Sequence, residues 1–117
     1  MRQGLAIAVA GLLLSACSRS PPPIASGIPV STGPTSFFGD RVKQQFPGGF
    51  AEATLMAELR NQRFAISETR DSNGLLIKSA LYEDQHFPCN ESWTIQWTSE
   101  SGKIKEISGI YSGERCL

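Results

Sequence analysis

The sequence predicts a small single α+β domain, in which one main helix packs on a four-stranded antiparallel sheet made of two hairpins. Two observations carry this prediction. Apolar residues recur every four positions within residues 50–62, as on one face of a helix, and they alternate with polar residues from residue 64 onward, as in strands. The links between the strands are short, which favours antiparallel pairing. The apolar face of such a sheet needs the helix as a cover.

The chain opens with one positive charge at Arg2 and then runs apolar for twelve residues, from Leu5 to Ala16. As a helix this run would be about 18 Å long, whereas the hydrocarbon core of a bilayer is about 30 Å thick. The run is therefore too short to span a membrane. A charged start, a short apolar middle and small residues at the exit are typical of a secretory signal peptide.

The end of this run, Leu14-Ser15-Ala16-Cys17, resembles the lipobox of bacterial lipoproteins and matches it at all four positions. The resemblance implies that residues 1–16 are a signal peptide, cleaved before Cys17, and that the Cys17 thiol carries a diacylglycerol. Two or three acyl chains anchor a protein stably to a membrane. Ser18 follows the cysteine, where lipoproteins retained in the inner membrane often have Asp. The resemblance thus favours the periplasmic face of the outer membrane over the inner membrane.

Residues 17–36 follow as a stretch that is rich in proline and nearly free of charge. Such a composition does not bury enough apolar surface to offset the entropy lost on ordering, so we expect a tether that holds the domain away from the membrane. The globular domain is then residues 37–117. A domain of about 80 residues buries only about 60% of its unfolded surface and is marginally stable.

The first part of the domain is helical. Residues 36–46 hold a short helical turn, and residues 47–49 break the chain with Pro-Gly-Gly. Residues 50–62 are rich in strong helix formers, and the apolar stripe consists of Ala51, Leu55, Met56 and Leu59. Glu52 and Glu58 are expected to face away from this stripe.

The remainder alternates. The predicted strands are residues 64–67, 75–82, 92–98 and 103–111. An Asp-Ser-Asn-Gly turn joins the first two, because Asn73-Gly74 tolerates positive φ. Residues 83–91 are expected to be a loop, bent by Pro88. The third strand is the clearest, with Trp93, Ile95 and Trp97 on one face.

The three cysteines divide into one for the lipid and two for a disulfide. With Cys17 lipidated, Cys89 and Cys116 remain, in a compartment outside the cytosol where disulfides persist. One precedes the third strand and the other follows the fourth, so the hairpin brings them together. A bridge there would stabilise the fold by about 3–4 kcal/mol. Free thiols and a metal site are the alternatives, but metal ligands are usually spaced more closely.

Composition excludes several function classes. The net charge is zero, from 11 basic and 11 acidic residues that are scattered along the chain, so nothing favours nucleic-acid binding. The single histidine, His86, has no nucleophile motif beside it, and Glu83-Asp84 has the pattern of a solvated loop. No phosphate-binding, zinc or dinucleotide motif is present in the sequence. We therefore expect no enzyme, no cofactor and no metal.

The aromatic residues Trp93, Trp97 and Tyr111 could form either the core or a binding surface, and in so small a domain we expect the core. The disulfide end is the best candidate for a rigid exposed surface. We predict a partner surface there, formed by Ser112, Gly113, Glu114 and Arg115.

Two lipoprotein families offer comparisons. The chain is similar to the BamE/SmpA lipoproteins, which assist outer-membrane assembly, in placing a helix and then a sheet behind a lipobox and a proline-rich stretch. Here Gly49, Leu55 and Leu59 fit the helix of that family, whereas its Leu-Gly-x-Pro step is missing. Ser108-Gly109-Ile110-Tyr111 resembles the Ser-Gly-x-x-Tyr loop of membrane-bound lysozyme inhibitors, one residue short.

Together these features predict a lipid-anchored, non-catalytic binding or accessory module in the periplasm. The expected partners are the membrane, through the lipid, and an envelope protein; the oligomeric state is left open. The alternative is a periplasmic inhibitor or immunity protein against a lysozyme or toxin, which would expose residues 108–111 as a loop.

Overall fold

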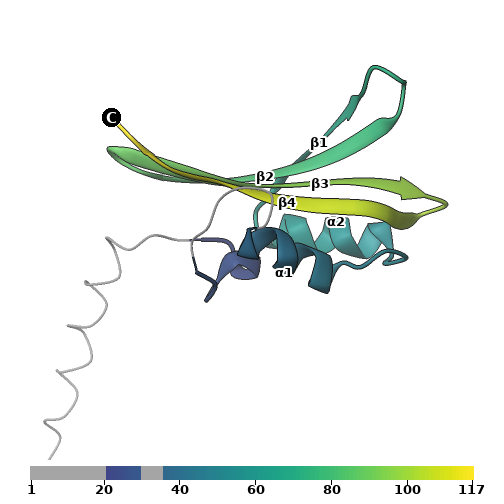
Figure 1. Ribbon diagram of the computed structural model, residues 1–117, viewed down its shortest axis with the longest axis horizontal. Coiled ribbons are helices and arrows are strands. Elements are labelled where there is room, and N and C mark those ends of the chain that lie inside the picture. Colours follow the sequence, from purple (N-terminus) through teal and green to yellow (C-terminus); the bar gives the residue numbers. More distant parts are fainter. Residues whose placement is uncertain (1–20, 30–35) are drawn as a thin grey trace, which may run out of the picture.

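The computed structural model describes residues 21–29 and 36–117, and it contains a four-stranded antiparallel sheet with two α-helices on one of its faces (Figure 1). The strands lie side by side in chain order and are β1 (Ala65–Arg70), β2 (Leu76–His86), β3 (Cys89–Glu100) and β4 (Lys103–Cys116). The predicted α+β class is confirmed. Because β2 also pairs with β3, the sheet is a continuous meander rather than two separate hairpins. The predicted signal peptide and Cys17 lie outside the described residues.

The two helices are similar in length. α1 (Phe37–Gln45) replaces the short helical turn that the sequence predicts, and it is capped by Ser36, whose Oγ accepts a hydrogen bond from the Gly39 N–H at 3.0 Å. α2 (Glu52–Asn61) lies within the predicted helix and buries Leu55 and Leu59. The helical part therefore has two helices of nine and ten residues instead of one main helix.

The sequence predicts that Glu52 faces away from the apolar stripe, but its side chain points to the sheet. Its Oε2 accepts hydrogen bonds from Lys78 Nζ at 2.8 Å and from Trp97 Nε1 at 2.9 Å. Burial opposes ionisation of Glu52, but these hydrogen bonds and the charge of Lys78 outweigh it and hold the pKa of the carboxyl below its usual value. The first turn of α2 is thereby fixed to the sheet.

The core lies between the helices and the sheet. Trp93, Trp97 and Tyr111, which the sequence assigns to the core, are buried in it. The core consists of apolar residues from every layer: Ile24, Ala25, Phe38, Val42, Phe46, Leu55, Leu59, Phe64, Ala80, Trp93, Ile95, Trp97, Ile104 and Tyr111. Gly109 allows α1 to approach β4 closely, since a Cβ at this position would lie 2.7 Å from Val42 Cγ2. Within residues 21–29 and 36–117, no helix is both long and apolar enough to cross a membrane.

The predicted boundary at residue 37 is wrong, because part of the expected tether belongs to the core. Pro22, Ile24 and Ala25 are buried, and a 3-10 helix, η2 (Pro23–Ala25), carries Ile24 into the apolar cluster. The Ile24 N–H donates to Gln62 Oε1 at 2.8 Å, and Arg41 Nη1 donates to the Ile24 carbonyl at 3.3 Å. Since proline has no N–H, the rest of this segment needs few hydrogen-bond partners to be buried.

The predicted loop at residues 83–91 is also wrong. β2 continues to His86 and β3 begins at Cys89, so that only Phe87 and Pro88 form the turn. The sequence predicts a loop here because proline is disfavoured in a central strand. Pro88, however, lies in the turn itself, where no hydrogen bond between strands is lost. The polar residues on either side of it extend the two strands.

Candidate functional site

The sequence places its candidate residues at the end of the sheet where β2 turns into β3 and β4 ends. Cys89 and Cys116 form the predicted disulfide there, with an S–S distance of 2.01 Å. The two cysteines are directly paired across β3 and β4, and His86 is paired with Cys89 across β2 and β3. Three strands are thus joined in one row of residues at this end.

A β-bulge in β4 decides which side chains meet in this row. Glu91 pairs with Glu114 and Trp93 pairs with Tyr111, so β4 has one residue more than β3 in this interval. Gly113, with φ of 82°, provides the backbone conformation that the bulge needs. Without the extra residue, strict alternation would turn Glu114 and Cys116 to the opposite face from Tyr111. The bulge instead keeps them on the side that the helices cover.

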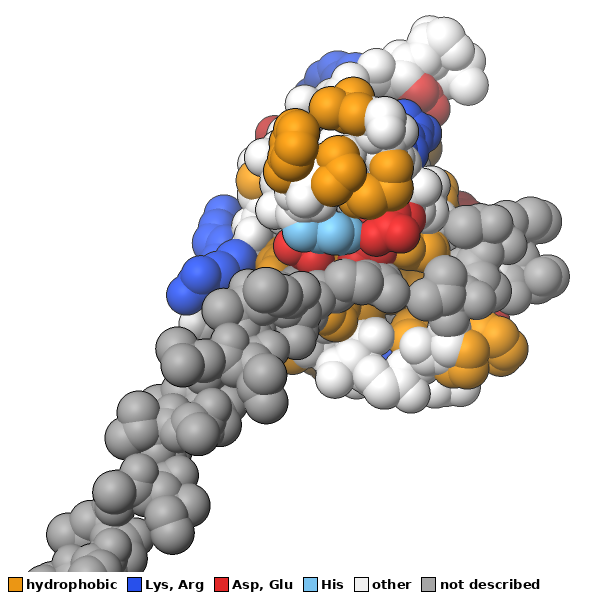
Figure 2. All heavy atoms as spheres, turned by 90° about the vertical axis from the view of Figure 1, so that its left-hand side faces the viewer, with side chains coloured by type: hydrophobic (Ala, Val, Ile, Leu, Met, Phe, Trp, Pro, Cys, Tyr) orange, Lys and Arg blue, Asp and Glu red, His pale blue; other side chains and the backbone are white. Residues whose placement is uncertain are grey.

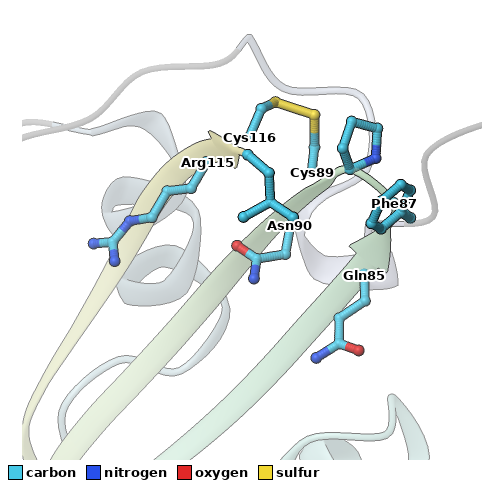
Figure 3. Close-up of a pocket in the computed structure, with 8 residues that line it drawn as sticks. Gln85, Phe87, Cys89, Asn90, Arg115 and Cys116 are labelled. Atoms are coloured by element: carbon cyan, nitrogen blue, oxygen red, sulfur yellow. A yellow bond between two sulfur atoms is a disulfide. The ribbon is translucent and has the colours of Figure 1, made fainter.

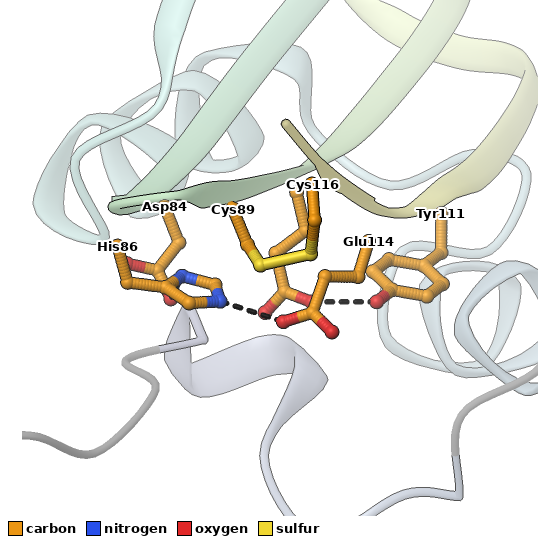
Figure 4. The surroundings of a disulfide bond; sticks show 7 residues. Asp84, His86, Cys89, Tyr111, Glu114 and Cys116 are labelled. Carbon is orange, nitrogen blue, oxygen red and sulfur yellow. Dashed lines mark hydrogen bonds and ion pairs between the residues drawn. A yellow bond between two sulfur atoms is a disulfide. The ribbon is translucent and has the colours of Figure 1, made fainter.

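On that side, His86 lies among three carboxylates. Its Nε2 is 2.6 Å from Glu114 Oε2, and its Nδ1 is 3.6 Å from Asp84 Oδ2 (Figure 4). We call His86, Asp84, Glu91 and Glu114 the His86 cluster. The hydrogen bond with Glu114 raises the pKa of His86 above its usual value, and the negative charges of Asp84, Glu114 and Glu91 add to this effect, while burial opposes it.

Glu91 is the buried member of the cluster, with 2% of its surface exposed. Tyr111 donates its hydroxyl hydrogen bond to Glu91 Oε2 at 2.6 Å (Figure 4). A buried carboxylate is tolerated only where such donors compensate for lost water. Tyr111 therefore connects the His86 cluster to the aromatic core, where its ring lies 5.2 Å from that of Trp93.

The chemistry open to this cluster is limited. Ser92 and Ser112 are the hydroxyl residues beside it in sequence, but their Oγ atoms lie 2.5 Å apart and bond to each other rather than to His86. One imidazole nitrogen, one sulfur and one carboxylate, from His86, Cys89 and Glu114, lie within 4.8 Å of one another and are atom types that ligate metals. The sulfur belongs to the disulfide and is no thiolate, so two donors remain.

The opposite, uncovered side of the same end has a different character. Gln85, Asn90 and Arg115 form a cross-strand row there, beside a depression of about 460 Å³ that is also lined by Phe87, Pro88, Leu117 and the two cysteines (Figure 3). The depression is not enclosed, because Phe87 is 89% exposed and Leu117 is 99% exposed. None of its lining residues has a carboxylate side chain.

The predicted partner surface is divided between these two sides. Glu114 contacts His86, and Ser112 contacts Ser92, so both side chains are engaged within the domain. Gly113 forms the bulge, whereas Arg115 is exposed on the uncovered side. The alternating pattern of the sequence alone does not predict this bulge, although a glycine within such a pattern is its usual signal.

Residues 108–111 do not form a loop. They lie within β4, and Tyr111 is buried, with 5% of its surface exposed. The exposed tyrosine that an inhibitory loop would require is therefore not present at this position.

Comparisons of the chain with models of known protein families, with curated proteins and with solved structures found no match.

Proposed function

We propose that the chain is a lipid-anchored protein of the bacterial cell envelope that works as a binding or accessory module, without catalysis. The observation that carries this proposal is Leu14-Ser15-Ala16-Cys17, placed directly after a charged start and a short apolar run. A lipid on Cys17 explains why such a run ends in a cysteine, and residues 17–117 would be the mature protein.

The cysteine chemistry supports this proposal. Cys89 and Cys116 are joined in a disulfide, which leaves Cys17 as the third cysteine of the chain. Disulfides persist outside the cytosol, in the compartment to which a signal peptide directs a protein. Ser18 after the cysteine favours the periplasmic face of the outer membrane in this reading.

The contacts of the titratable groups support a binding role rather than a catalytic one. A nucleophile needs a base within hydrogen-bond reach. Here the imidazole of His86 contacts Glu114, and the Tyr111 hydroxyl contacts Glu91, so these polar groups bind each other across the strands. Such cross-strand pairs stiffen the sheet end and suit it to present a surface. The expected protein partner is another envelope protein.

Incorporation of an alkyne-tagged palmitate analogue tests the anchor. In a Gram-negative host that expresses the full chain, we expect the label on the wild-type protein and its loss in the Cys17→Ser variant. The Cys89→Ser/Cys116→Ser double variant is the matched control, because it also loses cysteines and should keep the label. Label that persists without Cys17 would contradict the lipid assignment.

Recovery of partners tests the binding role. The lipidated wild-type chain, cross-linked in the envelope and isolated through an affinity tag, should retain an envelope protein in near-stoichiometric amount. The matched control is an unrelated lipoprotein with the same tag and anchor. Recovery of the same background from both chains would count against an accessory or binding module.

A further inference from the structure

The sheet end carries an apolar tip that no other part of the described chain covers. The tip consists of Phe87, Pro88 and Leu117, and Figure 2 shows hydrophobic side chains gathered at this end of the molecule. Phe87 and Leu117 are 89% and 99% exposed, the highest values among the large apolar residues of the described ranges. The Leu117 N–H donates to the Pro88 carbonyl at 3.0 Å, and the disulfide ties the strands behind it, so the tip is held in place. Contiguous exposed apolar groups, unlike single exposed residues, mark an interaction surface.

We propose that this tip contacts the phospholipid surface in which the lipid of Cys17 is embedded. This inference rests on the proposed lipid anchor and adds the orientation of the domain on the membrane.

The first argument is reach. η2 is packed into the core, and Pro21, where the described part of the chain begins, follows Cys17 by four positions in the sequence. Four residues span at most about 14 Å when fully extended. The headgroup layer of one leaflet is itself about 6 Å thick. The domain therefore stays at the bilayer surface, and one of its faces must meet the lipid.

The second argument is position. Figures 1 and 4 both place η2 beneath the half of the sheet that ends at the β2–β3 turn and Cys116. The chain thus enters the domain near the end that carries the apolar tip. The β1–β2 and β3–β4 turns lie toward the other end of the sheet (Figure 1).

The third argument is the chemistry of the surface. Phenylalanine and leucine combined with basic residues are the side chains with which amphipathic helices bind the membrane interface, and the same side chains can act there from a turn. Arg115 is exposed next to the tip, and a guanidinium binds phosphate oxygens in a bidentate manner. The neighbouring residues on this side, Gln85 and Asn90, are uncharged. The carboxylates of the His86 cluster belong to the helix-covered side of the sheet, and Figure 2 shows acidic side chains bordering the hydrophobic patch.

Quenching of a tryptophan placed in the tip tests the contact. The lipidated Phe87→Trp chain is reconstituted into vesicles of phosphatidylethanolamine and phosphatidylglycerol, with or without brominated acyl chains. The native Trp93 and Trp97 are buried, at 3% and 2% exposure, and add a constant background. The matched control is Leu75→Trp, since Leu75 is 52% exposed and precedes β2 at the β1–β2 turn. We expect brominated lipid to reduce the emission of Trp at 87 and to leave that of Trp at 75 unchanged.

The possible outcomes separate the tip from the anchor. Vesicle-bound protein with equal emission in both kinds of vesicle, or with equal quenching at positions 87 and 75, would overturn the proposed tip contact and leave the anchor standing. A chain that carries no lipid and stays in solution would overturn the anchor instead. In that case the same measurement on a chain whose Cys17 is coupled to a lipid-maleimide still decides the tip. Concentration-dependent dimers that bury Trp at 87 and leave it unquenched would assign the tip to a second copy and refute contact with lipid.

Discussion

Replacement of Ile24 by alanine should destabilise the domain, because Ile24 connects the proline-rich segment to the core. Its side chain is 2% exposed and lies in the apolar cluster. The change removes three carbons, which corresponds to about 2.4 kcal/mol at about 0.8 kcal/mol for each buried methylene. The cavity left behind adds to this loss. We expect the free energy of unfolding to fall by about 3 kcal/mol.

The matched control is Ile110→Ala, the same chemical change at a residue that is 49% exposed. Because Ile110 is already half exposed and its truncation leaves no closed cavity, we expect the free energy of unfolding to fall there by only about 1 kcal/mol. The two variants should therefore differ by about 2 kcal/mol, or by about 8–16 °C in the unfolding midpoint of a domain of this size. Urea unfolding, followed by the near-ultraviolet circular dichroism of the buried tryptophans, measures both. If Ile24→Ala cost no more than Ile110→Ala, the proline-rich segment would be a tether after all.

Three further predictions concern the sheet and its disulfide end. Gly109→Ala should lower the free energy of unfolding by about 1–3 kcal/mol, because the added Cβ would lie 2.7 Å from Val42 Cγ2. Gly48→Ala is the control and should leave the free energy of unfolding unchanged, because the nearest atom there is 3.9 Å away. Equal effects of the two variants in calorimetry would contradict the close packing of α1 on β4. The Cys89→Ser/Cys116→Ser double variant should lose about 3.5 kcal/mol in chemical denaturation, as expected for a separation of 27 residues, and an unchanged midpoint would show that the bridge is energetically neutral. The midpoint of the NMR titration of His86 should lie above pH 6.5 and move toward that value in Glu114→Gln, and a midpoint at or below 6.5 would rule the contact out. Since folding raises the pKa of His86, this contact stabilises the fold fully below pH 6.5, and the stabilisation is lost as the pH rises through the midpoint.

Much of the architecture could be predicted from local patterns. The four-residue spacing of Leu55 and Leu59 indicates α2, and the alternation of Trp93, Ile95 and Trp97 indicates β3 with its buried face. In both cases one element decides its own burial, because the period of the backbone places every apolar side chain on the same side. The pairing of Cys89 with Cys116 was predictable for the same reason, since a hairpin joins the two ends.

The errors have a common physical cause. Burial of Ile24 depends on Gln62 and Arg41, which lie 38 and 17 residues away and satisfy the backbone of a segment with no period of its own. Likewise, His86 contacts Glu114, which lies 28 residues further along the chain, and only the bulge at Gly113 turns the two side chains to the same face. Local composition describes neither partner, so on its own it predicts a tether for the proline-rich stretch and a loop for the charged one.

The packing of the proline-rich segment limits how freely the domain would move on the proposed lipid anchor. A long free tether would let the domain rotate and search the periplasm, and its surface would then carry no information about the membrane. Ile24 is held by Arg41 of α1 and by Gln62 at the end of α2, and only seven positions in the sequence separate it from Cys17. In the proposed lipid-anchored protein, the orientation of the domain would then follow from the fold, because the surface nearest Cys17 would face the lipid.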